Sequence, residues 1–186
     1  MAIFLVGFMG AGKSTVGQAL GRHLNWGFED LDERIERREG RSVAEIFRDS
    51  GEPAFRRAER AALQDVIEEL SAGVPRVVAL GGGAFVRQEN AALLEASSVP
   101  TIFLDAPVEE LWQRCCTQAA EAGAQRPLLR SRKQFDELYA VRRKSYSKAS
   151  LKIQTGSRAV RMVVAEIAEA LGLKEIATRT EQGEVE

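Results

Sequence analysis

The stretch Gly7-Phe8-Met9-Gly10-Ala11-Gly12-Lys13-Ser14-Thr15 decides the fold. It fits the Walker A pattern of two glycines that flank four residues and are followed by Lys and then Ser or Thr. An apolar run at 3–6 precedes it and predicts a buried parallel strand, and apolar residues at helical spacing over 16–24 predict a following helix. Strand, glycine-rich loop and helix are the context that this motif requires, so the sequence predicts a cradle for phosphate groups.

The residue types in this stretch indicate how a nucleotide would be bound. Glycines let the backbone wrap closely around a polyphosphate, so that backbone N–H groups and the positive end of the next helix face the anion. The Lys13 side chain would reach the β- and γ-phosphates, and the Ser14 hydroxyl would ligate Mg²⁺. The nucleotide-binding residues expected in the loop are Gly10, Ala11, Gly12, Lys13, Ser14 and Thr15.

Length and composition predict one globular domain. The chain has 186 residues, 45% of them hydrophobic and 28% charged, and we expect a single domain over 1–172 with a polar C-terminal tail over 173–186. A net charge of −1 argues against a nucleic-acid partner. Because no apolar run approaches the ~20 residues that span a bilayer and no basic signal segment precedes the first strand, we expect a cytoplasmic protein without a membrane partner.

Polar and glycine-rich segments follow the predicted strands. A second short strand finishes at Glu29-Asp30-Leu31-Asp32, so two aspartates leave a strand end. An apolar run at 77–80 continues into Gly81-Gly82-Gly83, which marks a close approach of the backbone to another group. Further strands are predicted at 101–104 and 151–153, and we interpret Asp105 as the N-cap of the next helix. The alternation of strands and helices predicts a parallel sheet with ligands beyond its carboxyl edge.

Two arginines lie on or beside the apolar faces of predicted helices. A long helix begins at Gly51-Glu52-Pro53, and Arg56 lies beside its apolar stripe. A helix over 133–146 carries Arg142 on its apolar face, where a charge is costly unless it meets an anion, an ion-pair partner or solvent. Before this helix the apolar periodicity lapses from 117 to 131, which predicts a loop.

A Walker A motif alone is compatible with a GTPase, a motor-type ATPase or a small-molecule kinase. The sequence contains neither the Asn-Lys-x-Asp nor the Asp-x-x-Gly motif of a GTPase. An ATPase needs a metal-binding Asp at the end of a central strand, and Asp105 leaves that possibility open. A kinase needs a metal site, an acceptor pocket and a charge clamp. The sequence offers Ser14 and Asp30 for the metal site. It offers Asp32, Arg56 and Gly82 for the acceptor pocket, and Arg126 for the charge clamp.

Six motifs, taken in order, closely resemble the shikimate kinase family. They are the loop at 7–15, Asp30-Leu31-Asp32, Gly51-Glu52 with Phe55-Arg56-x-x-Glu59, Leu80-Gly81-Gly82-Gly83-Ala84, Arg126-Pro127-Leu128-Leu129 and Arg142-x-x-x-Tyr146. The resemblance implies a monomeric P-loop, nucleoside-monophosphate-kinase-like α/β fold of three layers, with a five-stranded parallel sheet in the order 2-3-1-4-5. It also implies MgATP-dependent phosphorylation of the 3-hydroxyl of shikimate to shikimate 3-phosphate, on the pathway to chorismate and the aromatic amino acids.

The resemblance further implies roles for single residues. Those matching the shikimate-binding positions are Asp32, Arg56, Gly82 and Arg142. Those matching the phosphate and magnesium positions are Lys13, Arg126, Ser14 and Asp30. The residues expected to take part in catalysis are Lys13, Asp32 and Arg126.

The adenine side matches the family less closely. Arg114 matches a position near the adenine of ATP, and Arg158 is a further candidate. Family members typically have an Ile/Val-Asp-Thr loop with a nearby proline, whereas this chain has Ile153-Gln154-Thr155-Gly156-Ser157. The segment between Arg114 and Arg126, which includes part of the lid expected at about 117–130, is several residues longer than usual in the family.

Two alternatives stay open. A gluconate-type kinase would share the fold and the loop, but its Asp-x-His-Pro-like acceptor motif is not matched by Asp32-Glu33-Arg34. A nucleotide-binding regulatory module that has lost catalysis is the other alternative. The presence of Lys13, Ser14, Asp30 and Arg126 argues against this second alternative.

Overall fold

Five parallel strands form the sheet, in the order β2-β3-β1-β4-β5 that the family resemblance implied. The computed structural model describes residues 1–70, 73–122 and 131–173. The strands are β1 (Ala2–Val6), β2 (Gly27–Asp30), β3 (Arg76–Ala79), β4 (Thr101–Asp105) and β5 (Leu151–Gln154). Every residue of β1 and β4 is buried, as expected for central strands that are covered on both faces.

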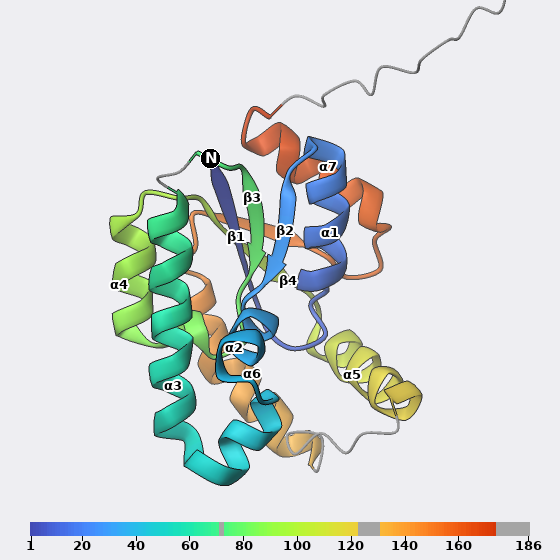
Figure 1. Ribbon diagram of the computed structural model, residues 1–186. Helices are drawn as coiled ribbons and strands as arrows, with labels where there is room; N and C mark the ends of the chain where they lie inside the picture. The colour runs from blue at the N-terminus through green and yellow to red at the C-terminus, as the bar shows by residue number, and fades with distance from the viewer. Residues whose placement is uncertain (71–72, 123–130, 174–186) are drawn as a thin grey trace, which may run out of the picture.

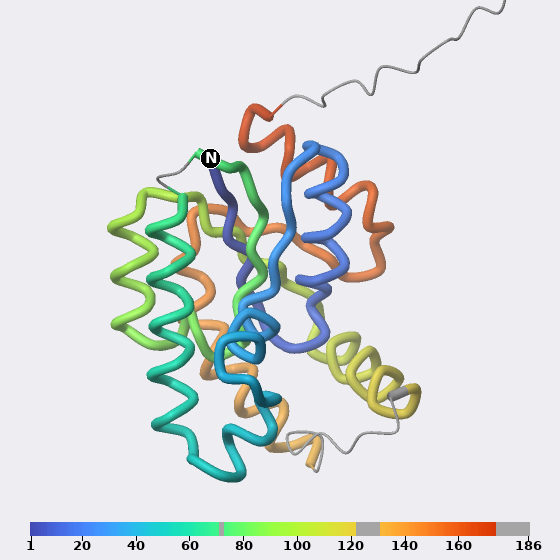
Figure 2. Tube along the Cα trace, viewed as in Figure 1, coloured from blue at the N-terminus to red at the C-terminus, as the bar shows by residue number. Residues whose placement is uncertain are grey.

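Helices cover the sheet on both sides and make three layers (Figure 1). In Figures 1 and 2, α1 (Lys13–Leu24) and α7 (Val160–Ala170) lie on one face, and α3 (Val43–Glu69) and α4 (Gln88–Ala96) lie on the other. Three helices lie near the carboxyl ends of the strands, and these are α2 (Leu31–Glu39), α5 (Val108–Ala122) and α6 (Arg132–Tyr146). The three-layer α/β fold predicted from the sequence is therefore confirmed.

The helix α3 is broken at Gly51, in the stretch where the sequence predicted the start of a long helix. Gly51 has φ 75° and ψ 174°, so two helical segments meet there at a kink. Ser42 and Glu45 form the capping box at the start of the first segment. The second segment starts near Pro53, which places Arg56 within one turn of its N-terminus.

Two differences from the predicted element boundaries affect the residues near the expected site. The helix α5 continues to Ala122, so residues 117–122 are helical rather than part of a loop. This turn is rich in strong helix formers such as Ala119 and Ala120, and a largely exposed helix needs no apolar stripe. The strand β2 ends at Asp30, whose side chain caps α2 by accepting the Asp32 N–H, so Asp32 belongs to a helix. Arg126 and the rest of the expected lid, 123–130, lie outside the described residues.

The interpretation of Asp105 as a helix cap was wrong. Its carboxylate is 4% exposed and accepts hydrogen bonds from Tyr139 (2.8 Å), Arg143 (3.1 Å) and Gln154 (3.3 Å). The Lys152 ammonium lies 2.9 Å away. Asp105 therefore joins the ends of β4 and β5 to α6, a tertiary role that its position before Pro107 does not reveal.

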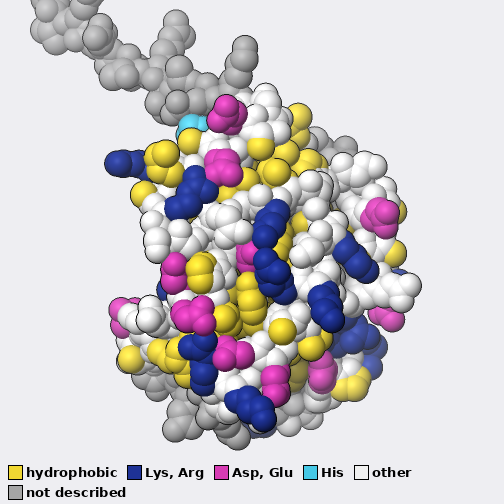
Figure 3. Space-filling view, turned by 180° about the vertical axis from the view of Figure 1, so that it is seen from behind, with side chains coloured by type: hydrophobic (Ala, Val, Ile, Leu, Met, Phe, Trp, Pro, Cys, Tyr) yellow, Lys and Arg dark blue, Asp and Glu magenta, His cyan; other side chains and the backbone are white. Residues whose placement is uncertain are grey.

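No helix in the described ranges combines the length and the apolar character needed to cross a membrane. On the face turned away from the view of Figure 1, Lys and Arg side chains are interspersed with Asp, Glu and hydrophobic ones (Figure 3).

We expect Asp105→Asn to lower the free energy of unfolding at pH 7 by about 1–3 kcal/mol, because it removes a buried charge-assisted hydrogen-bond acceptor. Hydrogen bonds from Lys152, Tyr139 and Arg143 outweigh burial and lower the pKa of Asp105 below its usual 3.8. The stabilisation is thus present above pH 3.8 and is lost as the pH falls through the lower, folded-state pKa. Urea denaturation at several pH values measures this difference.

The matched control is Asp136→Asn, which removes an exposed carboxylate that pairs with Arg132 on the surface of α6. Its effect should stay below about 0.5 kcal/mol at all pH values. Equal losses of unfolding free energy in the two variants would contradict the role of Asp105 as a buried hydrogen-bond acceptor that joins β4 and β5 to α6.

Candidate active site

The glycine-rich loop folds around the Lys13 side chain. Gly12 is the N-cap of α1 with φ 89°, a left-handed conformation that glycine adopts without steric cost. The Lys13 ammonium donates to the carbonyl oxygens of Gly7 (3.0 Å) and Phe8 (3.2 Å), both in the loop itself. Burial lowers the pKa of Lys13, while the charges of Asp32 and Asp30 oppose this shift. The loop thus holds the Lys13 cation at the N-terminus of α1. Both this charge and the helix dipole favour an anionic ligand at the loop.

Ser14 and Asp30 bring two side-chain oxygen atoms together at the carboxyl end of β2. The Ser14 hydroxyl donates to Asp30 Oδ2 at 2.9 Å, while Asp30 Oδ1 accepts the Asp32 N–H at 3.0 Å. Among the described residues, no group of three or more His, Cys, Asp or Glu side chains is arranged to hold a metal ion. Mg²⁺ in kinases uses only one or two protein ligands and takes the others from water and phosphate. The pair therefore fits Mg²⁺ bound together with a nucleotide.

Asp32 presents a buried carboxylate oxygen without a partner. Its Oδ1 atom is buried and accepts no hydrogen bond within the described part of the chain. A Cβ atom added to Gly81 would lie 2.7 Å from Oδ1, so only glycine leaves room for the carboxylate there. Burial and the charge of Asp30 raise the pKa of Asp32 to about 6, although Lys13 opposes the shift. The carboxylate is ionised at neutral pH and is available to a hydroxyl donor.

Arg56 lies against the same glycine turn from the side of α3. Its Nη1 atom donates to both carboxylate oxygens of Glu59 at 3.1 and 3.0 Å, and its Nη2 atom donates to Glu52 at 2.9 Å. A Cβ atom added to Gly83 would lie only 2.7 Å from Arg56 Nη1. Glu59 is 1% exposed, so this buried carboxylate fixes the direction of the guanidinium.

Arg142 approaches the turn from α6. Its guanidinium carbon lies 5.9 Å from the centre of the Phe8 ring, and a Cβ atom added to Gly82 would lie 3.4 Å from Arg142 Nη1. The side-chain ion pairs that α6 makes within the described ranges involve Arg132, Lys133 and Arg143. The guanidinium of Arg142 is thus directed at the glycine turn and remains available to an anionic ligand.

Sequence reasoning gave no role to two residues that organise this pocket. The Tyr146 hydroxyl donates to the carbonyl oxygen of Gly82, and the side chain is fully buried against Phe103. Burial raises the pKa of Tyr146 to about 12, so its hydroxyl keeps its proton. Glu59 is the second residue. Glu59 lies three residues after Arg56 and Tyr146 lies four residues after Arg142. These helical spacings are the signal that could have assigned both residues to the pocket.

The two arginines expected on the nucleotide side, Arg114 and Arg158, lie against different parts of the structure. Arg114 reaches back to the loop and donates to the carbonyl oxygens of Gly10 (3.3 Å) and Thr155 (3.0 Å). Arg158 donates to the carbonyl oxygen of Gln154 at 2.9 Å and pairs with a glutamate of α7. The structure therefore brings Arg114 to the phosphate loop and holds Arg158 against α7.

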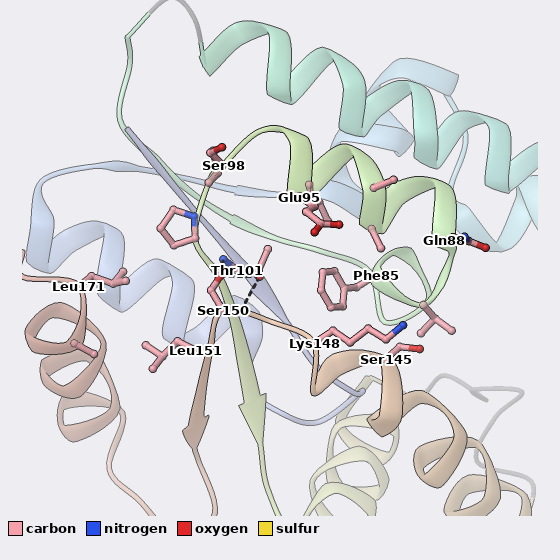
Figure 4. A pocket seen from close by; sticks show the side chains of 17 residues that line it. Phe85, Gln88, Glu95, Ser98, Thr101, Ser145, Lys148, Ser150, Leu151 and Leu171 are labelled. Carbon is pink, nitrogen blue, oxygen red and sulfur yellow. Dashed lines mark hydrogen bonds between the residues drawn. The ribbon is translucent and has the colours of Figure 1, made fainter.

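A pocket of about 880 Å³ among the described residues lies elsewhere. It opens where β4 and β5 begin, beside Thr101 and Leu151, and its wall includes Phe85 and Lys148 (Figure 4). None of the expected site residues lines it. Its position at the opposite edge of the sheet separates it from the candidate site, because ligands of parallel α/β sheets bind at the carboxyl edge.

Comparisons with known proteins agree with this geometry. The family model described as shikimate kinase matches residues 9–172. A shikimate kinase of Persephonella marina is 38% identical over 166 residues, which cover 89% of this chain and 95% of that protein.

Two solved structures are also similar. The shikimate kinase from Aquifex aeolicus has a TM-score of 0.79 at 38% identity, with 92% of this chain and 96% of that chain covered. The shikimate kinase from Acinetobacter baumannii in complex with shikimate has a TM-score of 0.80 at 32% identity, with coverages of 91% and 92%. The chain therefore belongs to the shikimate kinase family.

Proposed function

We propose that this chain transfers the γ-phosphoryl group of ATP to the 3-hydroxyl of shikimate in the cytoplasm, as a monomer, on the pathway to chorismate and the aromatic amino acids. The observation that carries the proposal is the unpartnered Oδ1 of Asp32, which lies beside the glycine turn that Arg56 and Arg142 also approach. Family membership supports the choice of substrate, because the related protein from Acinetobacter baumannii forms a complex with shikimate.

Acceptor binding follows from the charges of this pocket. Arg56 and Arg142 would bind the carboxylate of shikimate, since guanidinium groups form strong bidentate bonds with carboxylates. The N–H of Gly82 would approach a ring hydroxyl, because no side chain obstructs it. Asp32 would accept the hydrogen bond of the reacting hydroxyl and orient its oxygen toward the phosphate loop.

Phosphoryl transfer then depends on positioning and on charge. Lys13 would exchange its bonds to the loop carbonyls for bonds to the β- and γ-phosphates. Ser14 and Asp30 would hold Mg²⁺, which neutralises charge on the phosphate oxygens. Asp32 would take the proton of the 3-hydroxyl as the new bond to phosphorus forms, and a pKa of about 6 suits this role near neutral pH.

The segment 117–130 would act as the lid, with Arg126 reaching the transferring phosphate. Its first part is the exposed end of α5, which is continuous with the turn that carries Arg114. Closure would exclude water and complete the charge clamp, as lids do in other kinases.

Release of ADP from MgATP, measured side by side with shikimate, with gluconate and without an acceptor, tests the proposal. We expect release that depends on shikimate alone. Release with gluconate would favour the gluconate-type alternative, which the family match does not favour. Binding of nucleotide without any release would favour the inactive regulatory module.

We expect Asp32→Asn to lower kcat by about 10²–10⁴-fold, the range typical of a general base. In the wild type, kcat/KM for shikimate should fall below pH 6, where Asp32 becomes protonated, and this acid limb should be absent in the variant. Because folding raises the pKa of Asp32, its ionisation destabilises the fold above that pH, so the variant should unfold at the same or a higher temperature. Near-normal turnover in the variant would exclude a base at this position.

We expect Arg142→Lys to weaken shikimate binding at least about tenfold while ATP binding changes little, because lysine is a point charge and cannot present a planar fork. Arg57→Lys is the matched control, since Arg57 is exposed on α3 next to Arg56. Separate titrations of shikimate and ATP give both affinities. An unchanged affinity for shikimate in Arg142→Lys would remove this residue from the acceptor site.

Arg126→Ala should act on rate, with kcat lower by about 10³-fold or more and shikimate affinity nearly unchanged, as for an arginine finger. Lys133→Ala, an exposed change near the start of α6, should leave both quantities unchanged. Turnover at saturation and isothermal titration measure them. Lost shikimate binding with normal saturated turnover would place Arg126 in the acceptor site instead.

A further inference from the structure

The loop that follows β5 is held by a carboxylate of α5. Glu110 accepts the Ser157 N–H at 2.8 Å through Oε2 and the Ser157 hydroxyl at 3.0 Å through Oε1. Ser157 has φ 49°, a left-handed conformation that is uncommon for a residue with a side chain. The two hydrogen bonds that Ser157 donates to one carboxylate compensate for this conformation, so the loop is fixed where its backbone is least favourable.

The same loop is tied to the phosphate loop. The Thr155 hydroxyl is buried and lies 3.2 Å from the carbonyl oxygens of Ala11 and Asp105. A Cβ atom added to Gly156 would lie 2.6 Å from Pro107 Cδ and 3.1 Å from Glu110 Oε1. The loop therefore packs directly against the first turn of α5, and its position depends on that of α5.

Arg114 connects the three segments. Its Nη2 atom donates to Glu110 Oε2 at 3.1 Å and to the carbonyl oxygen of Thr155 at 3.0 Å, and its Nη1 atom lies 3.3 Å from the carbonyl oxygen of Gly10. Glu110 thus contacts both the loop and the arginine that approaches the phosphate loop. Glu110 lies one turn before Arg114, which is the spacing at which side chains on a helix meet.

We propose that Glu110 is a positioning residue for the base of the nucleotide. Through Ser157 and Arg114 it holds the loop 155–158 and the guanidinium as one rigid rim beside the phosphate cradle, and an adenine ring would lie against this rim. The segment Ile153-Gln154-Thr155-Gly156-Ser157 contains no proline that could stiffen it, so the contact with Glu110 supplies the rigidity. The inference rests on the proposed function, because it presupposes a nucleotide on the loop at 7–15.

The experiment compares two probes by isothermal titration in Mg²⁺, namely ADP and inorganic pyrophosphate. Pyrophosphate occupies the phosphate cradle but has no base, so it reports on the cradle alone. We expect Glu110→Gln to weaken ADP binding by about fivefold to tenfold, because a rim that is no longer preorganised must be ordered on binding, and to leave pyrophosphate affinity within about twofold. The KM for ATP should rise with kcat and the KM for shikimate little changed.

The matched control is Glu109→Gln, one residue away on α5, where the carboxylate is exposed and pairs with Arg132. This variant should change the affinity for neither ADP nor pyrophosphate. Ser157→Gly retains the backbone N–H and accepts the left-handed conformation, so its loss of ADP affinity should be smaller than that of Glu110→Gln.

Equal losses of ADP and pyrophosphate affinity in Glu110→Gln would overturn the proposal, because they would indicate a disturbed phosphate cradle. No loss of either affinity would also overturn it, because the contacts of Glu110 would then be unimportant for binding. Thermal unfolding of each variant identifies a folding defect, and an unfolded Glu110→Gln protein would make the residue structural. If the wild type binds ADP but does not phosphorylate shikimate, the proposed function fails while the positioning role of Glu110 is still tested by the two probes.

Discussion

Two carboxylates and one ammonium share a small volume at the end of β2, and the site depends on how their charges are balanced. Asp30 is satisfied by the Ser14 hydroxyl and by the backbone N–H of Asp32, so its charge is spread over two donors. Asp32 has no such donors on Oδ1, and burial together with the charge of Asp30 raises its pKa to about 6. An unpaired buried carboxylate is costly for the fold. A bound hydroxyl donor would offset this cost, which is why we propose this residue as a binding group for an alcohol.

Parallel register supplies the second constraint. Because β1, β2 and β3 are neighbours in one sheet, the phosphate loop, the two aspartates and the glycine turn all leave the same edge. Glycines 81–83 then let side chains from three helices approach the backbone closely, namely Asp32 from α2, Arg56 from α3 and Arg142 from α6. Buried partners hold this arrangement, since Glu59 directs Arg56 and the Tyr146 hydroxyl anchors the carbonyl of Gly82.

Local patterns predicted the parts of this structure that local physics determines. The glycine loop and the helix start at Gly51 were both readable, because each depends on neighbours within a few residues. The strand order came from the family resemblance, since apolar periodicity contains no information on which strands pair. The end of α5 was misread because an exposed helix has no apolar stripe. Asp105 pairs with Tyr139 and Glu110 pairs with Ser157, both more than thirty residues away in the chain, so only the fold could reveal these contacts.

The position of the phosphoryl group on the product tests the central claim most directly. Asp32 is proposed to orient one ring hydroxyl toward the phosphate loop, so a single regioisomer should form. A two-dimensional proton–phosphorus NMR correlation of the product made from MgATP and shikimate identifies the ring proton coupled to the new phosphate ester. Coupling to the proton on the carbon that bears the 3-hydroxyl is the predicted result. Coupling at another ring position, or a spectrum containing only ADP and inorganic phosphate, would contradict the account.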